Sequence, residues 1–308
     1  MNRRVYGLIG ISSVMSNWNA DFTGRPKSTS KGDIFGSDKA LKYPMKVMWD
    51  AQGEKVLYMK SFKEDKGKIN PRSLSERYEY VFGEKVAKDN DVVLGNLFKC
   101  IDVLNFGATF AEEKSNFSIT GAVQIGQGFN LYEDSRVEVQ DILSPFRNSK
   151  NDTAEASSLG TKIVSDEAHY CYPFTVNPNH YKNYAEIVKG FDGYTEEAYA
   201  KFKEAARTSA TAFATNSKIG CDNEYALFIE MKEGSQKALP ILTHYIGFEK
   251  NELETILDVT ELMTLIKEIE AIETVELFYN PSMIQVKDGS GFTDGKRFHI
   301  ITGKEVSL

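Results

Sequence analysis

The sequence predicts an α+β fold of the ferredoxin-like class, in which two long insertions interrupt one sheet. Apolar runs rich in β-branched and aromatic residues alternate with helical patterns in the order strand, helix, strand, strand, helix, strand, once the polar segments 51–115 and 127–166 are set aside. The chain has 308 residues, 41% hydrophobic and 26% charged, which is typical of a globular protein. RNA recognition motifs, which bind single-stranded RNA, have the same four-stranded architecture.

Each element is predicted from its own pattern. Residues 4–15 form a nearly continuous apolar run, which predicts a buried first strand. Ser37 is a helix N-cap residue, and Leu41, Met45 and Met48 follow it at helical spacing. The later elements, in chain order, are a strand over 117–125, a strand over 170–176, a helix capped by Thr195, a strand over 225–231, a helix near 261–271 and a strand near 275–279.

The charge is unevenly distributed along the chain. The formal net charge is −7, but residues 1–85 contain 16 Lys and Arg against 10 Asp and Glu, and the remainder contains 21 against 34. Phosphate binding depends on local basic clusters, so a basic N-terminal region on an acidic body fits a nucleic-acid partner. A lysine-rich solvated surface without any partner is the alternative.

Composition also bears on the cellular compartment. The longest apolar stretch, residues 5–15, is about eleven residues long, whereas a membrane-spanning helix needs about 20, so we expect no membrane association. Cys100, Cys171 and Cys221 are widely spaced and odd in number, which argues against a disulfide framework. The sequence therefore predicts a reducing, cytoplasmic location.

The sequence contains residue types that enzymes use, but not at the spacing that a catalytic or metal-binding site requires. The four histidines, His169, His180, His244 and His299, are far apart, and none pairs with another His or Cys at metal-ligand spacing. A phosphate-loop signature, a dinucleotide fingerprint and a GxSxG nucleophile elbow are all missing. We therefore expect no catalytic residue, no metal and no cofactor.

The most informative segment is residues 17–46, which reads NWNADFTGRPKSTSKGDIFGSDKALKYPMK. Amides and basic side chains bind phosphate oxygens, a helix N-terminus favours anions, and exposed aromatic rings such as Trp18 and Phe22 can stack on bases. Three lysines share one predicted helix face at spacings of three and four. The predicted RNA-binding residues are Asn17, Trp18, Asn19, Arg25, Lys27, Ser37, Lys39, Lys42 and Lys46. A merely solvated loop is the alternative.

Four stretches, in order, resemble the backbone subunit of type I CRISPR interference complexes (Cascade), closest to the type I-B branch, within the superfamily of repeat-associated RRM-like proteins. They are VYGLIGISSVMSNWNADFTGRP, IDVLNFGATF, SITGAVQIGQG, and YPFTVNP with the later SKIGCDNEYALFIEM. The chain departs from the family in two places: NWNADF stands where the family often has NPNGDP, and the arginine of its DVRLFG-type motif is missing.

The resemblance implies a hand-shaped protein with a ferredoxin/RRM-like palm. Residues 1–50, 116–126 and 167–308 would form the palm, 51–115 the fingers and 127–166 the thumb. Ile142, Leu143 and Phe146 would form an apolar thumb wedge that separates stacked bases.

The resemblance also implies the partners, which share one guide RNA. They are the guide RNA (crRNA), complementary single-stranded target DNA, further copies of the chain in a filament, and the large, cap and crRNA-processing subunits of Cascade.

Two other functions stay open at this stage. A related type III branch cuts target RNA with a loop acid, for which Asp21 or Asp33 is the candidate here, and Asp38 is a third acid of the same region that could bind a metal. An unrelated ferredoxin-like metabolic enzyme is the other alternative, although no catalytic constellation supports it.

Overall fold

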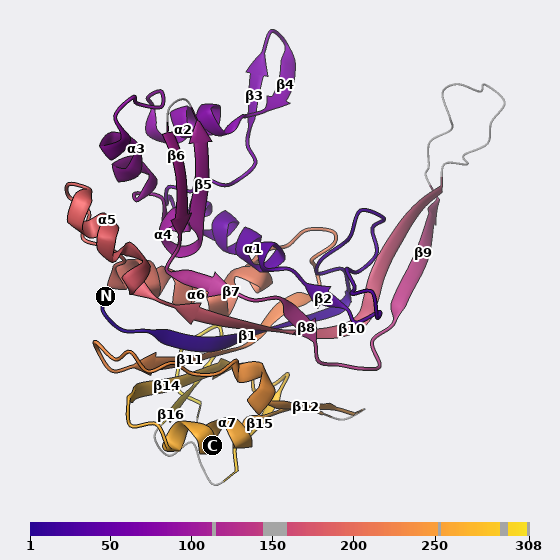
Figure 1. Cartoon of the computed structure of the whole chain (residues 1–308). Coiled ribbons are helices and arrows are strands. Elements are labelled where there is room, and N and C mark those ends of the chain that lie inside the picture. Colours follow the sequence, from indigo (N-terminus) through magenta and orange to yellow (C-terminus); the bar gives the residue numbers. More distant parts are fainter. Residues whose placement is uncertain (113–114, 144–158, 252–253, 290–294, 307–308) are drawn as a thin grey trace, which may run out of the picture.

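The computed structural model describes residues 1–112, 115–143, 159–251, 254–289 and 295–306 (Figure 1). Its largest sheet has nine strands, of which seven follow the order β16-β14-β11-β1-β10-β8-β2, while β7 and β9 also pair with β10. The strands of this sheet are β1 Val5–Ser16, β2 Phe35–Gly36, β7 Val123–Ile125, β8 Gly128–Asn130, β9 Val137–Leu143, β10 Leu159–Val176, β11 Cys221–Met231, β14 Ile272–Tyr279 and β16 Gly295–His299.

The predicted ferredoxin-like order is confirmed in the middle of this sheet. The four strands β11, β1, β10 and β7 lie side by side in that order, and each neighbouring pair is antiparallel. Numbered along the chain they are strands 4, 1, 3 and 2, which is the order of the split βαβ fold. Beyond β11 the sheet continues with β14, antiparallel to β11, and β16, parallel to β14.

Both faces of the sheet are covered, which explains why its first strand is a continuous apolar run. Val5, Ile9 and Ile11 of β1 belong to a core beneath α1 (Asp38–Ala51) and α6 (Glu196–Ala212). Tyr6 and Leu8 point to the opposite face, into a second core. The elements over that core are η2 Leu242–Tyr245, α7 Thr260–Lys267, and a small sheet of β12 Gly247–Lys250, β13 Thr255–Asp258 and β15 Gln285–Lys287.

The remaining elements are β3 Phe62–Asp65, β4 Lys68–Pro71, α2 Leu74–Phe82, α3 Asn90–Leu97, α4 Ile101–Phe106, β5 Gly107–Glu112, β6 Ser115–Thr120, η1 Pro178–Tyr181 and α5 Lys182–Ile187.

The predicted strand over 117–125 is wrong as a single element. β6 pairs with β5 in a separate hairpin, and of the two strands β7 alone joins the central sheet. The chain turns between them at Gly121, where a Cβ atom would lie 2.2 Å from the amide nitrogen of Gly107. The hairpin β5–β6 therefore crosses the boundary expected at residues 115 and 116.

The second insertion contains a long arm of two strands (Figure 1). β9 pairs only with the first part of β10, from Leu143 opposite Leu159 to Val137 opposite Ser165. β10 then continues without interruption into the central sheet, where it pairs with β1. The expected boundary at residue 166 therefore falls inside a strand.

Two further observations concern the helices. The helix predicted near 261–271 ends at Lys267, and β14 begins at Ile272. Among the residues that the structure describes, no helix is long and apolar enough to cross a membrane.

Candidate nucleic-acid interface

The loop between β1 and α1 is held by its own amide side chains. The Asn17 amide nitrogen donates to the carbonyl oxygens of Gly24 at 2.9 Å and Ile163 at 3.1 Å, which ties the loop to the root of the β9–β10 hairpin. The amide of Ser37 donates to Asn19 Oδ1 at 2.8 Å, and the Ser37 hydroxyl caps α1 as predicted. These three predicted RNA-binding side chains thus shape the loop through contacts within the chain.

Trp18 lies in the core, which contradicts its predicted role as a base-stacking residue. Its ring is 0% exposed, and its Nε1 donates to the Tyr172 hydroxyl at 2.6 Å. Gly36 leaves the room for this pair, because a Cβ there would lie 1.8 Å from the Tyr172 hydroxyl. An indole is apolar enough to be buried once its N–H has an acceptor. Phe22, in contrast, is fully exposed.

Basic side chains of the loop lie beside a second aromatic pair. Arg25 is exposed, and Lys27 Nζ lies 5.5 Å from the centre of the Phe35 ring. The ring centroids of Phe35 and Phe129 are 5.9 Å apart, and Phe129 is largely exposed. The spacing of residues in the sequence did not reveal this pair, because Phe129 reaches the loop only through the pairing of β2 with β8.

The lysines of α1 do not form one solvent-facing row. Lys39 is exposed, whereas Lys42 Nζ lies 2.9 Å from the Asp38 carboxylate. Lys46 is partly buried, with its Nζ 3.6 Å from Asp102 and 3.2 Å from the carbonyl oxygen of Tyr58, and burial lowers its pKa. The helix has two covered faces because the 51–115 insertion packs against the side that the sequence assigned to solvent.

Lys218 is a functional candidate that the sequence did not suggest. Its Nζ donates to the carbonyl oxygens of Asn17, at 2.7 Å, and Trp18, and lies 5.2 Å from the Trp18 ring. Burial lowers the pKa of Lys218 to about 8. The residue lies about two hundred positions from the loop in sequence, so only the folded structure brings the two together.

The carboxylates of the loop acids Asp21 and Asp33 accept hydrogen bonds from neighbouring turn residues. Asp21 Oδ1 accepts hydrogen bonds from the amide and hydroxyl of Thr23, at 2.8 and 2.7 Å, and from the amide of Arg25 at 3.0 Å. The Thr23 hydrogen bond is the main cause that lowers the pKa of Asp21. Asp33 accepts from the Thr29 hydroxyl at 3.1 Å. Within the described ranges, no three His, Cys, Asp or Glu side chains are grouped closely enough to hold a metal ion.

The expected thumb wedge is described only in part. Ile142 and Leu143 are exposed near the far end of β9, on opposite faces of the strand because strand side chains alternate. Phe146 lies outside the described residues.

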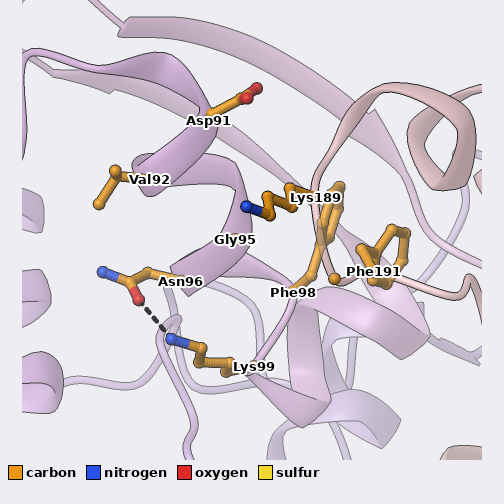
Figure 2. A pocket seen from close by; sticks show the side chains of 9 residues that line it. Asp91, Val92, Gly95, Asn96, Phe98, Lys99, Lys189 and Phe191 are labelled. Carbon is orange, nitrogen blue, oxygen red and sulfur yellow. Dashed lines mark hydrogen bonds between the residues drawn. The ribbon is translucent and has the colours of Figure 1, made fainter.

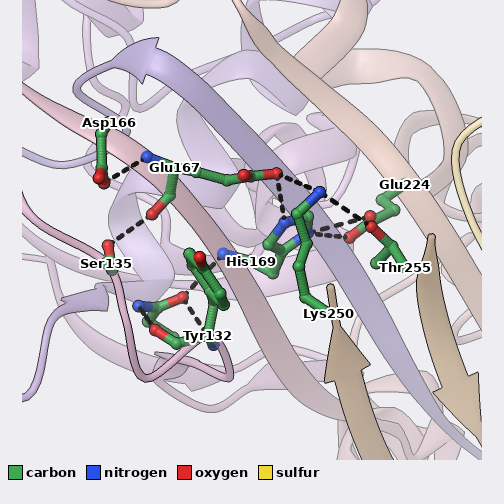
Figure 3. Close-up of polar contacts among 9 residues, drawn as sticks. Tyr132, Ser135, Asp166, Glu167, His169, Glu224, Lys250 and Thr255 are labelled. Atoms are coloured by element: carbon green, nitrogen blue, oxygen red, sulfur yellow. Dashed lines mark hydrogen bonds and ion pairs between the residues drawn. The ribbon is translucent and has the colours of Figure 1, made fainter. Parts of the chain in front are cut away.

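A charged network lies at the root of the β9–β10 hairpin, on the face that β12 covers (Figure 3). His169 Nδ1 lies 2.9 Å from Glu224, and its Nε2 lies 3.1 Å from Glu167, which also pairs with Lys250 of β12 at 3.0 Å. An imidazole that donates to two carboxylates carries a proton on each nitrogen. Burial opposes that charge, but the two carboxylates outweigh burial and raise the pKa of His169.

A pocket of about 460 Å³ lies between α3 and the turn that follows α5 (Figure 2). The rings of Phe98 and Phe191 stack with centroids 4.1 Å apart at its wall, and Lys99 Nζ donates to Asn96 Oδ1 at 2.9 Å. None of the predicted RNA-binding residues lines this pocket.

Comparison with known proteins identifies the family. The family model described as CRISPR-associated protein Cas7 matches residues 3–271. The chain belongs to the Cas7 family. The match includes β1, the loop, both insertions and the strands of the ferredoxin-like order, so the resemblance seen in the sequence is confirmed at the level of the family.

Two solved structures are similar to this chain. A chain of a "CRISPR RNA-guided surveillance complex, pre-nicking" is 12% identical, with a TM-score of 0.53, and the alignment covers 96% of each chain. A chain of a "CRISPR RNA-guided surveillance complex" is 14% identical, with a TM-score of 0.49 and 94% of each chain covered. No curated protein matches. The first of these likenesses supports the fold of the chain.

The second stretch of the Cas7 resemblance, IDVLNFGATF, serves the fold in this chain. Asp102 accepts hydrogen bonds from the amides of Leu57 and Tyr58, at 2.9 and 2.8 Å, which fixes the start of the 51–115 insertion. Asn105 accepts from the Tyr194 hydroxyl at 2.7 Å. In this chain Asp102 and Asn105 of the stretch therefore have structural roles.

Proposed function

We propose that this chain is a guide-RNA-binding subunit that assembles in several copies along one crRNA to form the backbone of a type I CRISPR interference complex. The observation that carries the proposal is the Cas7-family match over residues 3–271. The exposed basic side chains Arg25, Lys31 and Lys39 support it, because they lie on or next to the loop that Asn17 ties to the β9–β10 hairpin. Lysine and arginine bind phosphates whatever the base sequence. A guide-binding subunit needs only this kind of contact, because base pairing between guide and target recognises the target sequence.

The proposal includes the division of the chain and its partners. Residues 1–50, 116–126 and 167–308 act as the palm, 51–115 as the fingers and 127–166 as the thumb, except that β6 stays with the fingers through its pairing with β5 and the thumb ends within β10. The partners are crRNA, complementary single-stranded target DNA, further copies of the chain, and the large, cap and crRNA-processing subunits. The type I-B branch and a cytoplasmic location remain predictions.

We further propose that the subunit binds nucleic acid without cutting it. Cleavage by a loop acid needs a carboxylate that is free to hold a metal or a water molecule. The hydrogen bonds of Asp21 and Asp33 to neighbouring turn residues support a structural role instead. Labelled complementary RNA, incubated with the assembled complex and Mg²⁺, should stay intact, whereas cleavage that Asp21→Ala or Asp33→Ala abolishes would establish the nuclease.

Co-expression with the genomic neighbours tests the main proposal. A processed small RNA and partner subunits should co-purify with the chain, at an absorbance ratio well above that of protein alone. Recovery of the chain free of nucleic acid and of partner subunits under low-salt conditions would contradict the proposal.

A further inference from the structure

The pocket between α3 and the turn that follows α5 has the size of a ligand-binding site (Figure 2). Its volume is about 460 Å³, within the range of about 300–1,000 Å³ that ligand pockets usually have. The residues that line it belong to α3, to the two positions after α3 and to residues 189–191. The pocket therefore lies where the 51–115 insertion meets a distant segment of the chain.

Gly95 leaves space in this pocket that a side chain would occupy. It lies within α3 (Asn90–Leu97), and a Cβ atom at this position would have no other atom within 4 Å. Neither the helical backbone nor a close neighbour therefore requires a glycine here. Because glycine destabilises a helix relative to alanine, the chain keeps this space at a cost in stability.

The apolar part of the pocket is a stacked pair of aromatic rings. The ring centroids of Phe98 and Phe191 are 4.1 Å apart, and Tyr181 and Tyr184 contact Phe98 edge-on, at 5.5 and 5.2 Å between centroids. Phe98 is only 5% exposed, so it has no free face on which a nucleobase could stack. Val92 adds an exposed apolar side chain to the lining, and this surface suits a compact aliphatic group.

Two lysines give the pocket a positive charge that no carboxylate neutralises. Lys99 Nζ donates to Asn96 Oδ1, a neutral acceptor, at 2.9 Å, which leaves two of its three N–H groups for another acceptor. Lys189 is exposed and forms no hydrogen bond or ion pair within the part of the chain that the structure describes. Asp91, the acid in the lining, lies in the first turn of α3, where the helix dipole favours a negative charge. The two ammonium groups therefore favour an anionic group on the ligand.

The neutral polar side chain of the pocket is already fully used. Asn96 Nδ2 donates to the Tyr78 hydroxyl and to Glu84, both at 2.8 Å, and its Oδ1 accepts from Lys99. Asn96 therefore has no amide hydrogen left for the edge of a nucleobase. An apolar group needs no such partner, so the buried part of the ligand is expected to be apolar.

We propose that this pocket binds a segment of a partner protein in which an apolar side chain stands next to a carboxylate. The apolar side chain occupies the space beside Gly95, against the stacked rings of Phe98 and Phe191, and the carboxylate lies between Lys99 and Lys189. The rings and the glycine give the buried anchor, and the ammonium groups give charge-assisted hydrogen bonds. The site is additional to guide-RNA binding and does not depend on it.

Saturation-transfer NMR on the full chain tests the site with a defined probe. The probe is an unlabelled peptide, Gly-Leu-Glu-Gly, with both ends blocked, and its matched control has Gln in place of Glu. The leucine methyl protons of the Glu peptide should receive saturation from the protein, because they lie against the rings. The Glu peptide should bind at least about tenfold more tightly than the Gln peptide, because only the carboxylate forms charge-assisted hydrogen bonds to both lysines.

Variants of the chain assign the peptide to this pocket. Gly95→Leu fills the space, and Lys99→Gln with Lys189→Gln removes both positive charges, so each change should weaken binding of the Glu peptide at least about tenfold. Lys88→Gln with Lys182→Gln is the matched control. It alters two exposed lysines that do not line the pocket, and it should leave binding unchanged.

Gly95→Ala tests whether the fold itself needs the glycine. Because alanine is the better helix former, this variant should unfold at a higher temperature than the parent and should bind the Glu peptide less tightly. A lower unfolding temperature would show that Gly95 serves the fold, which contradicts the inference.

Three other results would overturn the proposal. They are equal binding of the Glu and Gln peptides, absence of saturation transfer at millimolar peptide, and binding that survives both pocket variants. Adenosine monophosphate that binds more tightly than the Glu peptide and is lost in Gly95→Leu would identify a nucleotide site and overturn it as well. RNA binding by Gly95→Leu should equal that of the parent, so failure of this site is distinguishable from failure of the guide-RNA proposal.

Discussion

Replacing His169 with leucine removes the positive charge that faces Glu224 at the root of the β9–β10 hairpin. Glu224 is 1% exposed, and its carboxylate accepts hydrogen bonds only from His169 among the described residues. Removing one partner of a buried ion pair leaves an uncompensated buried charge and costs about 3–5 kcal/mol. We expect His169→Leu to lower the free energy of unfolding by that amount at about pH 6, where the raised pKa keeps His169 charged, measured by urea denaturation followed by circular dichroism.

A double variant makes the reasoning specific. Apolar pairs often replace buried ion pairs at little cost, so His169→Leu with Glu224→Leu should recover most of the lost stability. The reasoning fails if the free energy of unfolding of the single variant lies within about 0.5 kcal/mol of the parent's value, or if the double variant is no more stable than the single one.

The same network predicts a dependence on pH. The groups that face His169 are Glu224 on β11, Glu167 on β10, Lys250 on β12, which pairs with Glu167, and Tyr132 in the loop after β8. Because the folded-state pKa of His169 is raised, its contribution to stability is complete below about pH 6.5 and is lost as the pH rises through the folded-state value. Stability should therefore fall in the parent as the pH rises above about 6.5, and His169→Leu should remove this part of the slope.

Three further predictions concern the loop, α1 and the end of β1. Arg25→Ala and Lys39→Ala should each weaken binding to all RNA sequences alike in a filter-binding titration, and should reduce the salt slope of binding by about 0.7 per lost phosphate contact. Lys42→Ala is the matched control and should leave the slope unchanged, because the ammonium of Lys42 already pairs with Asp38. Met15→Gly should stabilise the fold by about 1 kcal/mol in thermal unfolding, because Met15 has φ 47, whereas Met283→Gly, at another exposed methionine outside the left-handed region, should not. Lys218→Met should weaken RNA binding by loosening the loop carbonyls of Asn17 and Trp18, and an unchanged affinity with unchanged loop protection in hydrogen exchange would refute its assignment as a positioning residue.

The sequence predicted the fold well where periodicity decides it. The buried run over residues 4–15, the Ser37 cap and the later apolar strands are local patterns, and the order of the strands follows from them. The strand over 117–125 was misjudged because an apolar run does not show that Gly121 must turn beside Gly107. Local patterns therefore gave the order of elements but not every boundary.

The candidate site was harder to predict because its contacts are long-range. Trp18 meets Tyr172, and Lys46 meets Asp102, across separations that no spacing rule covers. Exposure decides whether an aromatic or a lysine is free for a ligand, and exposure depends on which segments pack nearby. The basic character of the region was visible in the sequence, whereas the division between exposed cations such as Lys39 and partnered ones such as Lys46 was not.

The continuity of β10 has a mechanical consequence. Its 18 residues span about 60 Å, and one uninterrupted backbone serves both the projecting hairpin and the central sheet. A separate hairpin on a flexible connection could swing freely, but this one can change direction only if β10 bends or if ladder hydrogen bonds to β1 break. Load on the far end of the hairpin is therefore carried into the middle of the central sheet, and the twist of that sheet sets the direction in which the hairpin projects.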